Sequence, residues 1–205
     1  MTGPMTGTPF PTSGRYAACA KSPLTGGWGE ATASGFWGVE LKKAGFDGII
    51  IKGISQKPVY MYIEDGGIKL ISADHLWGKG TYETFDIIKS DHGKDVKVLA
   101  IGPAGENLVR FAMIMADDER TLSRCGLGAV MGSKKLKAIA VRGSKRIAIA
   151  NERRLEEVVK KVNEIIINSK SAQNLRKFGT AGLVDICEPL GDLPKKNWSV
   201  GAWPE

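Results

Sequence analysis

Two arginines and a run of glycines stand close together in the middle of the chain. Arg120 and Arg124 lie in a polar segment, and the spacing Gly126-x-Gly128-x-x-x-Gly132 follows directly. An arginine carries a permanent positive charge and a fixed fork of N–H donors. Glycines have no side chain, so backbone N–H groups at such positions can approach a ligand closely. These residues therefore predict a binding site for a large anionic ligand.

Three interpretations of this region are open from the residues alone. In the first, the glycines only turn the chain and the arginines are solvated. In the second, they form a dinucleotide-binding loop, but such a loop follows a strand, and residues 117–124 lack a strand pattern. In the third, two loops, 29–35 and 117–128, together hold an elongated, doubly anionic cofactor. The paired loops and a further arginine, Arg15, favour the third interpretation.

Composition and charge exclude several classes of protein. The 205 residues are 42% apolar, which is enough to build a core in one or two domains, and the net charge is +7. The basic residues are dispersed and are not interleaved with stacking aromatics, so no nucleic-acid partner is expected. No apolar run approaches the roughly 20 residues of a membrane helix, and the N-terminus lacks a signal-peptide pattern. We therefore expect a cytoplasmic protein without membrane contact.

The three cysteines lie far apart in the sequence. Their spacing matches neither a metal-binding motif nor a disulfide framework. Cys19 stands in an apolar, strand-like run and is predicted to be a core residue. Cys125 lies within the loop 117–128 and is a candidate for a thiol that lines the site.

Hydrophobic periodicity and turn residues predict a succession of strands and helices before residue 150. Strands are predicted at residues 15–21, 48–52, 59–64, 68–72, 96–101 and 136–141. Helices are predicted at residues 37–44, 82–90 and 106–116. Residues 22–35 are predicted to form a loop, and Asp65-Gly66-Gly67 a hairpin turn.

The sequence also repeats itself weakly at a constant offset. Residues 47–53 resemble residues 137–143, and Gly38 corresponds to Gly128. From Asn151, a helix cap followed by apolar residues at helical spacing indicates a second, helical unit. The predicted fold class is therefore α+β. A β-rich N-terminal domain, residues 1–148, has a pseudo-twofold internal duplication and is followed by the start of a helical domain, residues 149–205, without a closing strand or cap.

Several long blocks of this sequence, in one order, resemble the N-terminal domain of aldehyde ferredoxin oxidoreductases, which are tungsten–pterin, iron–sulfur enzymes. The blocks are residues 11–16 (PTSGRY), 20–26 (AKSPLTG), 41–47 (LKKAGFD), 101–109 (IGPAGENLV) and 128–138 (GAVMGSKKLKA). The resemblance covers about residues 2–151, and Gly191-Asp192-Leu193-Pro194 resembles the early second domain of the family.

This resemblance implies that the first domain is the base for two molybdopterin ligands, which chelate one tungsten or molybdenum, with a magnesium ion between their phosphates. It assigns the backbone carbonyls of Thr32 and Thr121 to magnesium, for which hard oxygen donors are suitable. It assigns Arg120 to a pterin phosphate, and Arg15 to a position between the pterin and the cluster. The implied cofactor-binding set is completed by Ala33, Ser34 and Arg124.

The implied function is that of the cofactor-binding portion of an aldehyde:ferredoxin oxidoreductase. Such an enzyme oxidises aldehydes to carboxylic acids and passes electrons through a 4Fe–4S cluster to ferredoxin. The cluster cysteines and proton-transfer residues of the family have no counterpart here, so the chain is expected to be truncated at both ends, without a catalytic residue, and inactive alone. A separate chain with the C-terminal domains is one expected partner, and a homodimer is left open. The alternative is a non-catalytic pterin-binding fragment or a remnant without activity.

Overall fold

The computed structural model of the chain describes residues 1–117 and 119–200. Position 118 of the predicted loop 117–128 and positions 201–205 of the predicted second domain lie outside the described residues. The chain forms two compact units, the first from Met1 to Ala150 and the second beginning at Asn151.

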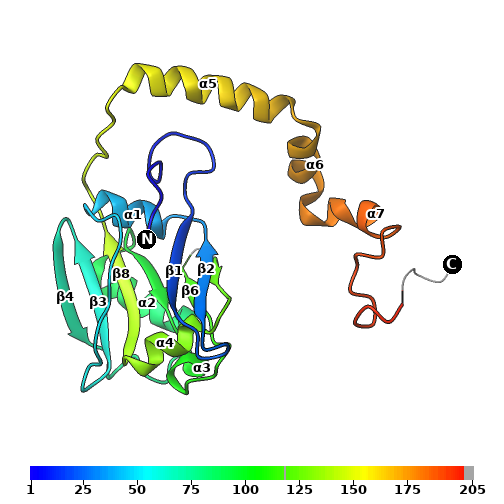
Figure 1. Cartoon of the computed structure of the whole chain (residues 1–205). Helices are drawn as coiled ribbons and strands as arrows, with labels where there is room; N and C mark the ends of the chain where they lie inside the picture. The colour runs from blue at the N-terminus through cyan, green and yellow to red at the C-terminus, as the bar shows by residue number, and fades with distance from the viewer. Residues whose placement is uncertain (118, 201–205) are drawn as a thin grey trace. The chain divides into compact units, whose positions relative to one another are not determined.

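A six-stranded mixed sheet runs through the first unit (Figure 1). Its strands, in chain order, are β3 (Val59–Glu64), β4 (Gly67–Ser72), β5 (Lys97–Ala100), β6 (Ile114–Ala116), β7 (Thr121–Leu122) and β8 (Leu136–Arg142). They lie in the order β4-β3-β8-β5-β6-β7, in which β8 is parallel to β3 and antiparallel to β5. All of β8 except Arg142 is buried, because a strand in the middle of a covered sheet has apolar layers on both sides.

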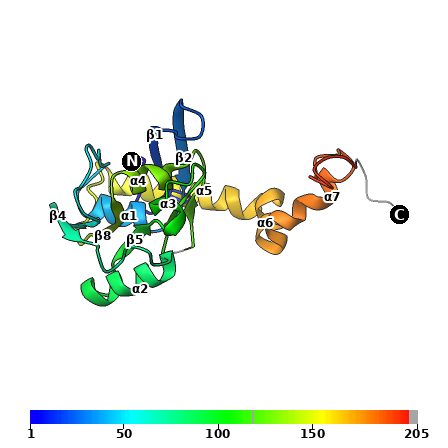
Figure 2. The ribbon, with the colours of Figure 1, turned by 90° about the horizontal axis from the view of Figure 1, so that it is seen from below.

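A separate antiparallel hairpin and several helices cover this sheet. The hairpin pairs β1 (Tyr16–Lys21) with β2 (Trp28–Ala33), and the helices are α1 (Trp37–Lys43), α2 (Thr81–His92), α3 (Pro103–Glu106) and α4 (Leu127–Ser133). The hairpin, α1 and α4 lie over one face of the sheet, and α2 lies over the other (Figure 2). Trp37, Leu41 and Met131 belong to the first apolar layer, and Phe85 and Ile88 of α2 belong to the second.

The second unit consists of helices among the residues described. They are α5 (Glu152–Asn168), α6 (Lys170–Phe178), a 3-10 helix η1 (Gly179–Leu183) and α7 (Val184–Cys187). The predicted cap at the start of α5 is confirmed, because Asn151 Oδ1 accepts a hydrogen bond from Arg154 N at 2.9 Å. The expected α+β class, with a β-rich first unit and helices after it, is also confirmed.

Two predicted segments have a different secondary structure. The predicted loop 22–35 contains the strand β2, which pairs with β1 along its whole length. The predicted helix 106–116 is wrong: α3 ends at Glu106, Leu108 has a left-handed φ of 58°, and Ile114–Ala116 forms β6. A left-handed residue cannot continue a right-handed helix, so the apolar residues that follow enter the sheet instead.

The predicted strand 48–52 is also wrong. Its alternation is real, since Ile49 and Ile51 pack partly against the core while Ile50 is 85% exposed. No neighbouring strand pairs with it in the described chain, however. The segment that follows it is held by the link between α4 and β8, because Lys134 Nζ donates to Gly53 O at 3.1 Å. The alternation of apolar residues therefore reflects alternate burial of side chains here, although the segment is not part of a β-sheet.

The weak sequence repeat corresponds to a structural repeat of helices but not of strands. α1 starts at Trp37 and α4 starts at Leu127, which is an offset of 127 − 37 = 90, and both helices have seven residues. The glycine-rich run forms the helix α4, which overlaps the last two residues of the predicted loop 117–128. The strand part of the echo differs between the copies, because residues 136–142 form β8 whereas residues 48–52 are irregular.

The tyrosines under α2 predict a loss of stability at alkaline pH. Tyr60 is buried, and its hydroxyl lies 2.8 Å from His92 Nε2. Burial, and then the Asp91 carboxylate, raises the pKa of Tyr60 above its ordinary value of 10.0, and burial also raises the pKa of Tyr62. The folded chain therefore favours the neutral phenols. This contribution to stability is fully present below pH 10.0 and is lost as the pH rises through the folded-state pKa.

Urea denaturation on both sides of pH 10.0 checks this expectation. The free energy of unfolding should decline on the alkaline side, and the decline should be smaller in Tyr60→Phe, which removes one ionisable group. The variant also loses the hydrogen bond to His92, so the informative quantity is the pH dependence and not the absolute stability. An equally steep decline in wild type and Tyr60→Phe would contradict the assignment.

Candidate anion-binding site between β2 and the segment after β7

A hollow of about 280 Å³ lies between the two segments that the sequence singled out. On one side it is lined by Glu30, Ala31 and Thr32 of β2. On the other side it is lined by Ser123 and Arg124, directly after β7. The predicted loops 29–35 and 117–128 therefore meet at one place, although they are far apart in the sequence.

The alternation of β2 separates exposed from buried side chains along this wall of the hollow. Gly29, Ala31 and Ala33 are buried, whereas Glu30 and Thr32 are exposed. Residues two apart in a strand share a face, so the Glu30 carboxylate and the Thr32 hydroxyl are presented on the same side of β2.

Two guanidinium groups bring positive charge to this hollow. Arg15 precedes β1, and its Nη1 donates to Thr32 Oγ1 at 2.9 Å, so its side chain is held beside β2. Arg124 lines the hollow itself and is exposed. Within the described residues Arg124 forms no side-chain hydrogen bond or ion pair, so its donors are available for an anion.

The backbone register leaves two carbonyl groups free of their hairpin partners. Ala17, opposite Thr32, exchanges both of its backbone hydrogen bonds with Met1, so Thr32 N–H and C=O point away from β1. Ala116 N donates to Arg120 O at 2.7 Å, so the next residue, Thr121, likewise points its carbonyl away from β6. Because β2 and β7 are neighbours, both carbonyls belong to the region between the two strands.

The second wall of the hollow is anchored by close backbone packing. Gly126 has a φ of +70°, and a Cβ at this position would lie 1.8 Å from Arg110 O, so only glycine fits. Cys125 is fixed to the hairpin from both ends, since Ser22 Oγ donates to its carbonyl at 2.9 Å and its Sγ lies 3.6 Å from Glu30 O. The thiol thus contacts the strand that lines the hollow, in the region where the sequence suggested a site-lining thiol.

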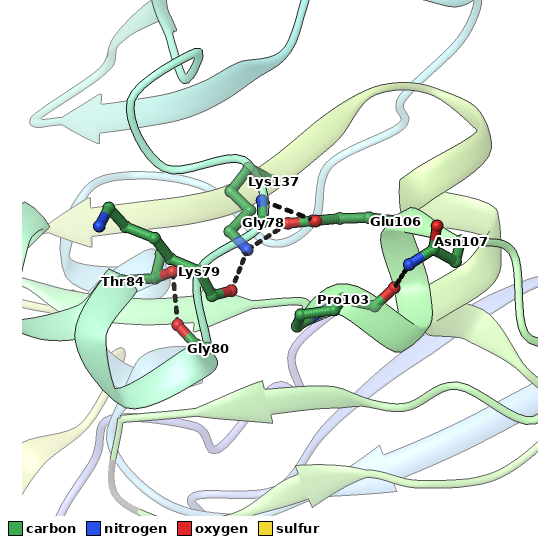
Figure 3. Close-up of polar contacts among 8 residues, drawn as sticks. All are labelled: Gly78, Lys79, Gly80, Thr84, Pro103, Glu106, Asn107 and Lys137. Atoms are coloured by element: carbon green, nitrogen blue, oxygen red, sulfur yellow. Dashed lines mark hydrogen bonds and ion pairs between the residues drawn. The ribbon is translucent and has the colours of Figure 1, made fainter.

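A buried ion pair links α3 to β8 (Figure 3). The ammonium group of Lys137 pairs with the Glu106 carboxylate and also donates to Lys79 O at 2.7 Å. The second carboxylate oxygen of Glu106 accepts from Gly78 N at 2.8 Å. Both charged groups therefore have hydrogen-bond partners, as burial requires. No role for this pair was expected from the sequence.

Several of the predicted site residues lie outside the lining of the hollow. Arg120 is exposed at the turn before β7, and Thr121 is half-buried in β7. Ala33 is buried, and Ser34 is half-buried after the end of β2. Glu30, Ala31 and Ser123 were missed. An alternation in residues 28–33 was the available signal for Glu30, because it places this residue on the same face as Thr32.

The donor set suits an anion of phosphate type together with a hard cation. Guanidinium groups and hydroxyls bind phosphate oxygens, and carbonyl and carboxylate oxygens are ligands that Mg²⁺ prefers. Among the residues described, no group of three histidine, cysteine or acidic side chains could hold a metal alone. A cation at this place would therefore depend on backbone carbonyls and on the ligand's own oxygens.

The prediction for Cys19 is wrong, because its side chain is exposed on β1 rather than buried in the core. The hairpin presents alternate residues to the sheet, and Cys19 stands on the outer side of that alternation. A separate observation concerns membranes: none of the helices among the described residues is both long and apolar enough to span one.

Comparison with known proteins gives a consistent result. The family model "Aldehyde ferredoxin oxidoreductase, N-terminal domain" matches residues 1–143. The tungsten-containing aldehyde ferredoxin oxidoreductase of Pyrococcus furiosus is 49% identical over 204 residues, and that of Thermococcus kodakarensis is 48% identical over 203 residues. Each alignment covers 98% of this chain but 34% of the relative, so the chain spans about a third of the length of the relatives it matches.

A solved structure extends the comparison to the fold. The active-site complex BamBC of benzoyl coenzyme A reductase, in complex with 1,5-dienoyl-CoA, aligns with a TM-score of 0.79 and 39% sequence identity. The alignment covers 82% of this chain and 26% of that chain.

Proposed function

We propose that this chain, which belongs to the aldehyde ferredoxin oxidoreductase family, binds and orients the tungsten–pterin cofactor of an aldehyde-oxidising enzyme. The whole protein oxidises an aldehyde to a carboxylic acid, with water as the source of the added oxygen and with the release of two electrons and two protons. The electrons leave through a 4Fe–4S cluster to ferredoxin, and the protons leave to solvent. Since the chain spans about a third of its relatives, these partners and the cluster are supplied outside the residues present here.

The observation that carries this proposal is the hollow between β2 and residues 123–124. It brings together Arg124, whose guanidinium group has no ion-pair partner among the described residues, and the hydroxyl-bearing residues Thr32 and Ser123, around a space of about 280 Å³. A buried phosphate needs N–H and O–H donors to replace its water, and these groups can supply them. The hollow thus supports a role in holding a pterin phosphate.

The chain's own residues would have two roles: the arginines supply positive charge, and backbone groups position the cofactor. When bound, the tungsten centre supplies the oxidation chemistry. Arg15, held by its hydrogen bond to Thr32, keeps a positive charge beside the cofactor, and this charge stabilises anionic ligands. The carbonyl groups of Thr32 and Thr121, which point away from β1 and β6, would hold the magnesium ion. Arg120 would supply charge to a phosphate group of the cofactor, and Ala33 and Ser34 would form the backbone wall that follows Thr32.

Cofactor retention in an Arg124→Ala variant tests the proposal. Hydrogen bonds to charged groups contribute about 1.5–3 kcal/mol, so the variant should hold pterin roughly 10- to 100-fold less tightly. We expect tungsten and pterin in the wild-type protein purified anaerobically from its native cells, and depletion of both in the variant. Arg153→Ala is the matched control, because Arg153 is an exposed arginine of α5 in the second unit. Wild-type protein without tungsten and pterin would refute the function.

The alternative is a pterin-binding fragment without activity of its own. The chain has three cysteines, and none of the described residues forms a cluster that could ligate a metal. This favours a chain that binds the cofactor without turning over aldehyde alone. A viologen-linked assay separates the two: turnover by the purified chain, free of other polypeptides, would overturn this view.

A further inference from the structure

Two backbone edges in the first unit lack hydrogen-bond partners among the described residues. The first is the outer edge of β1, beyond the point where Ala17 exchanges backbone hydrogen bonds of 2.7 and 2.9 Å with Met1. Backbone groups of residues two apart in a strand point the same way, so those of Cys19 and Lys21 also point away from β2. No described residue bonds to them there.

The second edge is the irregular segment 48–52. Its side chains alternate as they do in a strand, since Ile49 and Ile51 pack partly against the core whereas Ile50 is 85% exposed. Within the described chain, none of its backbone N–H and C=O groups forms a hydrogen bond. Such groups are the ones through which a neighbouring strand would pair.

The first two residues of the chain show that these edges face one another. Met1 pairs with β1, and Thr2 N donates to Asp47 O at 2.8 Å, directly before the second edge. Met1 and Thr2 thus bond to both edges at one end of a gap, beside β1, and the gap is one strand wide there (Figure 1). Because Asp47 directs its carbonyl into this gap, the backbone groups of Ile49 and Ile51 are directed into it as well.

An apolar hollow of about 190 Å³ lies between the two edges. It is lined by residues 16–20 of β1 and by Ile49 and Ile51 from the other edge. A neighbouring hollow of about 580 Å³ also reaches Cys19 and Ile51. A small apolar ligand would leave the backbone groups of both edges unpaired, whereas an extended peptide can bond to both.

We propose that a polypeptide outside residues 1–205 inserts one β-strand into this gap, where it pairs with β1 on one side and with residues 48–52 on the other. Its apolar side chains, at alternate positions, fill the hollow, and acidic residues flank them, because Lys21 and Lys134 line the neighbouring hollow. The chain covers 34% of its relatives, so proteins of this family have further sequence that can supply the strand. This docking surface shares no lining residue with the hollow beside Arg124.

A synthetic peptide, Glu-Val-Thr-Val-Thr-Val-Glu with blocked termini, is the probe. When extended it has valine on one face and threonine on the other, and both residue types favour strands. The matched control is the same peptide with N-methylated threonines, which keeps every side chain but cannot donate to one of the two edges. The readouts on the full chain are the alkylation rate of Cys19, which is exposed and lines the gap, and hydrogen exchange at the amides of Ile49 and Ile51. Cys187, in the second unit, is the internal control.

Binding should protect the gap and leave the second unit unchanged. At a peptide concentration of about ten times Kd, only about a tenth of the chain is free, so alkylation of Cys19 and exchange at Ile49 and Ile51 should slow about tenfold. Cys187 should react at the same rate with and without peptide. The N-methylated peptide, at the same concentration, should leave all of these rates unchanged.

Two proline variants test the direction of the second edge. Ile51→Pro removes an N–H that faces the gap and should weaken peptide binding roughly tenfold, whereas Ile50→Pro removes one that faces away and should not weaken it. Ile51→Ala keeps the N–H and should bind better than Ile51→Pro, which separates the hydrogen bond from the lost side chain. Equal binding by Ile50→Pro and Ile51→Pro would overturn the pairing with residues 48–52.

The same strand joined directly in front of Met1 covers the case of weak binding in trans, because Met1 lies at the end of the gap and the join raises the effective concentration to about the millimolar range. Protection of Cys19 in this chain, but not in one with proline at the threonine positions, supports the inserted strand. Equally fast alkylation of Cys19 with free peptide, with the joined strand and with neither would overturn it. A chain whose Cys19 becomes protected only as it dimerises, without peptide, would assign the gap to a second copy and would overturn it too.

Discussion

Replacing Lys137 with methionine should lower the free energy of unfolding of the first unit by about 3–5 kcal/mol. The side chain of Lys137 is 0% exposed and that of its partner Glu106 is 4% exposed. Methionine fills a similar volume, so the cost comes from the Glu106 carboxylate, which remains buried without its counter-charge. The Lys79 carbonyl also loses its hydrogen bond from the ammonium group. Urea denaturation of the full chain measures the loss.

A surface pair provides the matched control. Lys79 Nζ pairs with Glu83 in α2, where both side chains are substantially exposed, so Lys79→Met should cost less than about 1 kcal/mol. In the double variant Lys137→Met, Glu106→Gln, the cost should be smaller than the sum of the single costs, because no buried charge is left over. A cost below about 1 kcal/mol for Lys137→Met would contradict the role of the pair.

Local pattern was sufficient where neighbouring residues decide the structure. The hairpin of β3 and β4 was predictable, because apolar strand residues flank an Asp65-Gly66 turn that needs two left-handed residues. The cap at Asn151 was predictable for the same reason: a short polar side chain before a helical apolar pattern can bond only to the next turn.

In the segments whose secondary structure was predicted wrongly, tertiary contacts determine the structure. Residues 28–33 contain glycine, alanine and glutamate, which have low strand propensity, and they form β2 because β1 lies alongside. Residues 108–115 carry apolar residues at helical spacing, but the left-handed Leu108 ends the helix and Ile114 pairs into the sheet. Neither outcome depends on the local sequence alone.

The candidate site was partly predictable for this reason. Thr32 and Arg124 were predicted from the resemblance to a known family, and both line the hollow. Glu30 was missed because its place on the face of Thr32 depends on β2 being a strand. The face on which a residue of β2 lies depends on the register of β2 against β1. Because residues 22–35 were predicted to form a loop, this strand pairing was not expected.

The glycines of α4 explain why no helix was predicted at residues 127–133. Glycine costs about 1 kcal/mol relative to alanine inside a helix, so a run with Gly128 and Gly132 predicts a turn. In this fold the glycines are required by close packing of α4 on α3 and on the segment before β6. A Cβ on Gly132 would lie 1.9 Å from Gly105 O of α3, and a Cβ on Gly128 would lie 2.4 Å from Met113 O. The helix forms because contact with backbone offsets its poor propensity.

Gly132→Ala should therefore destabilise the first unit by about 3 kcal/mol, the upper part of the usual cost of overpacking, since the clash is with backbone and no side chain can rotate away. Gly27→Ala is the matched control: a Cβ there would lie 3.8 Å from its nearest neighbour, and the change in free energy of unfolding should stay within about 0.5 kcal/mol.

The same substitution should also act on the site. α4 begins one residue after Gly126, so a displacement of α4 from α3 moves the segment that carries Ser123 and Arg124 relative to β2. Protein that remains folded with Gly132→Ala should hold less tungsten and pterin than wild type, whereas Gly27→Ala should hold the same amount. Normal stability together with normal cofactor content in Gly132→Ala would show that α3 and α4 can separate without consequence, and that close glycine packing does not position the second wall of the hollow.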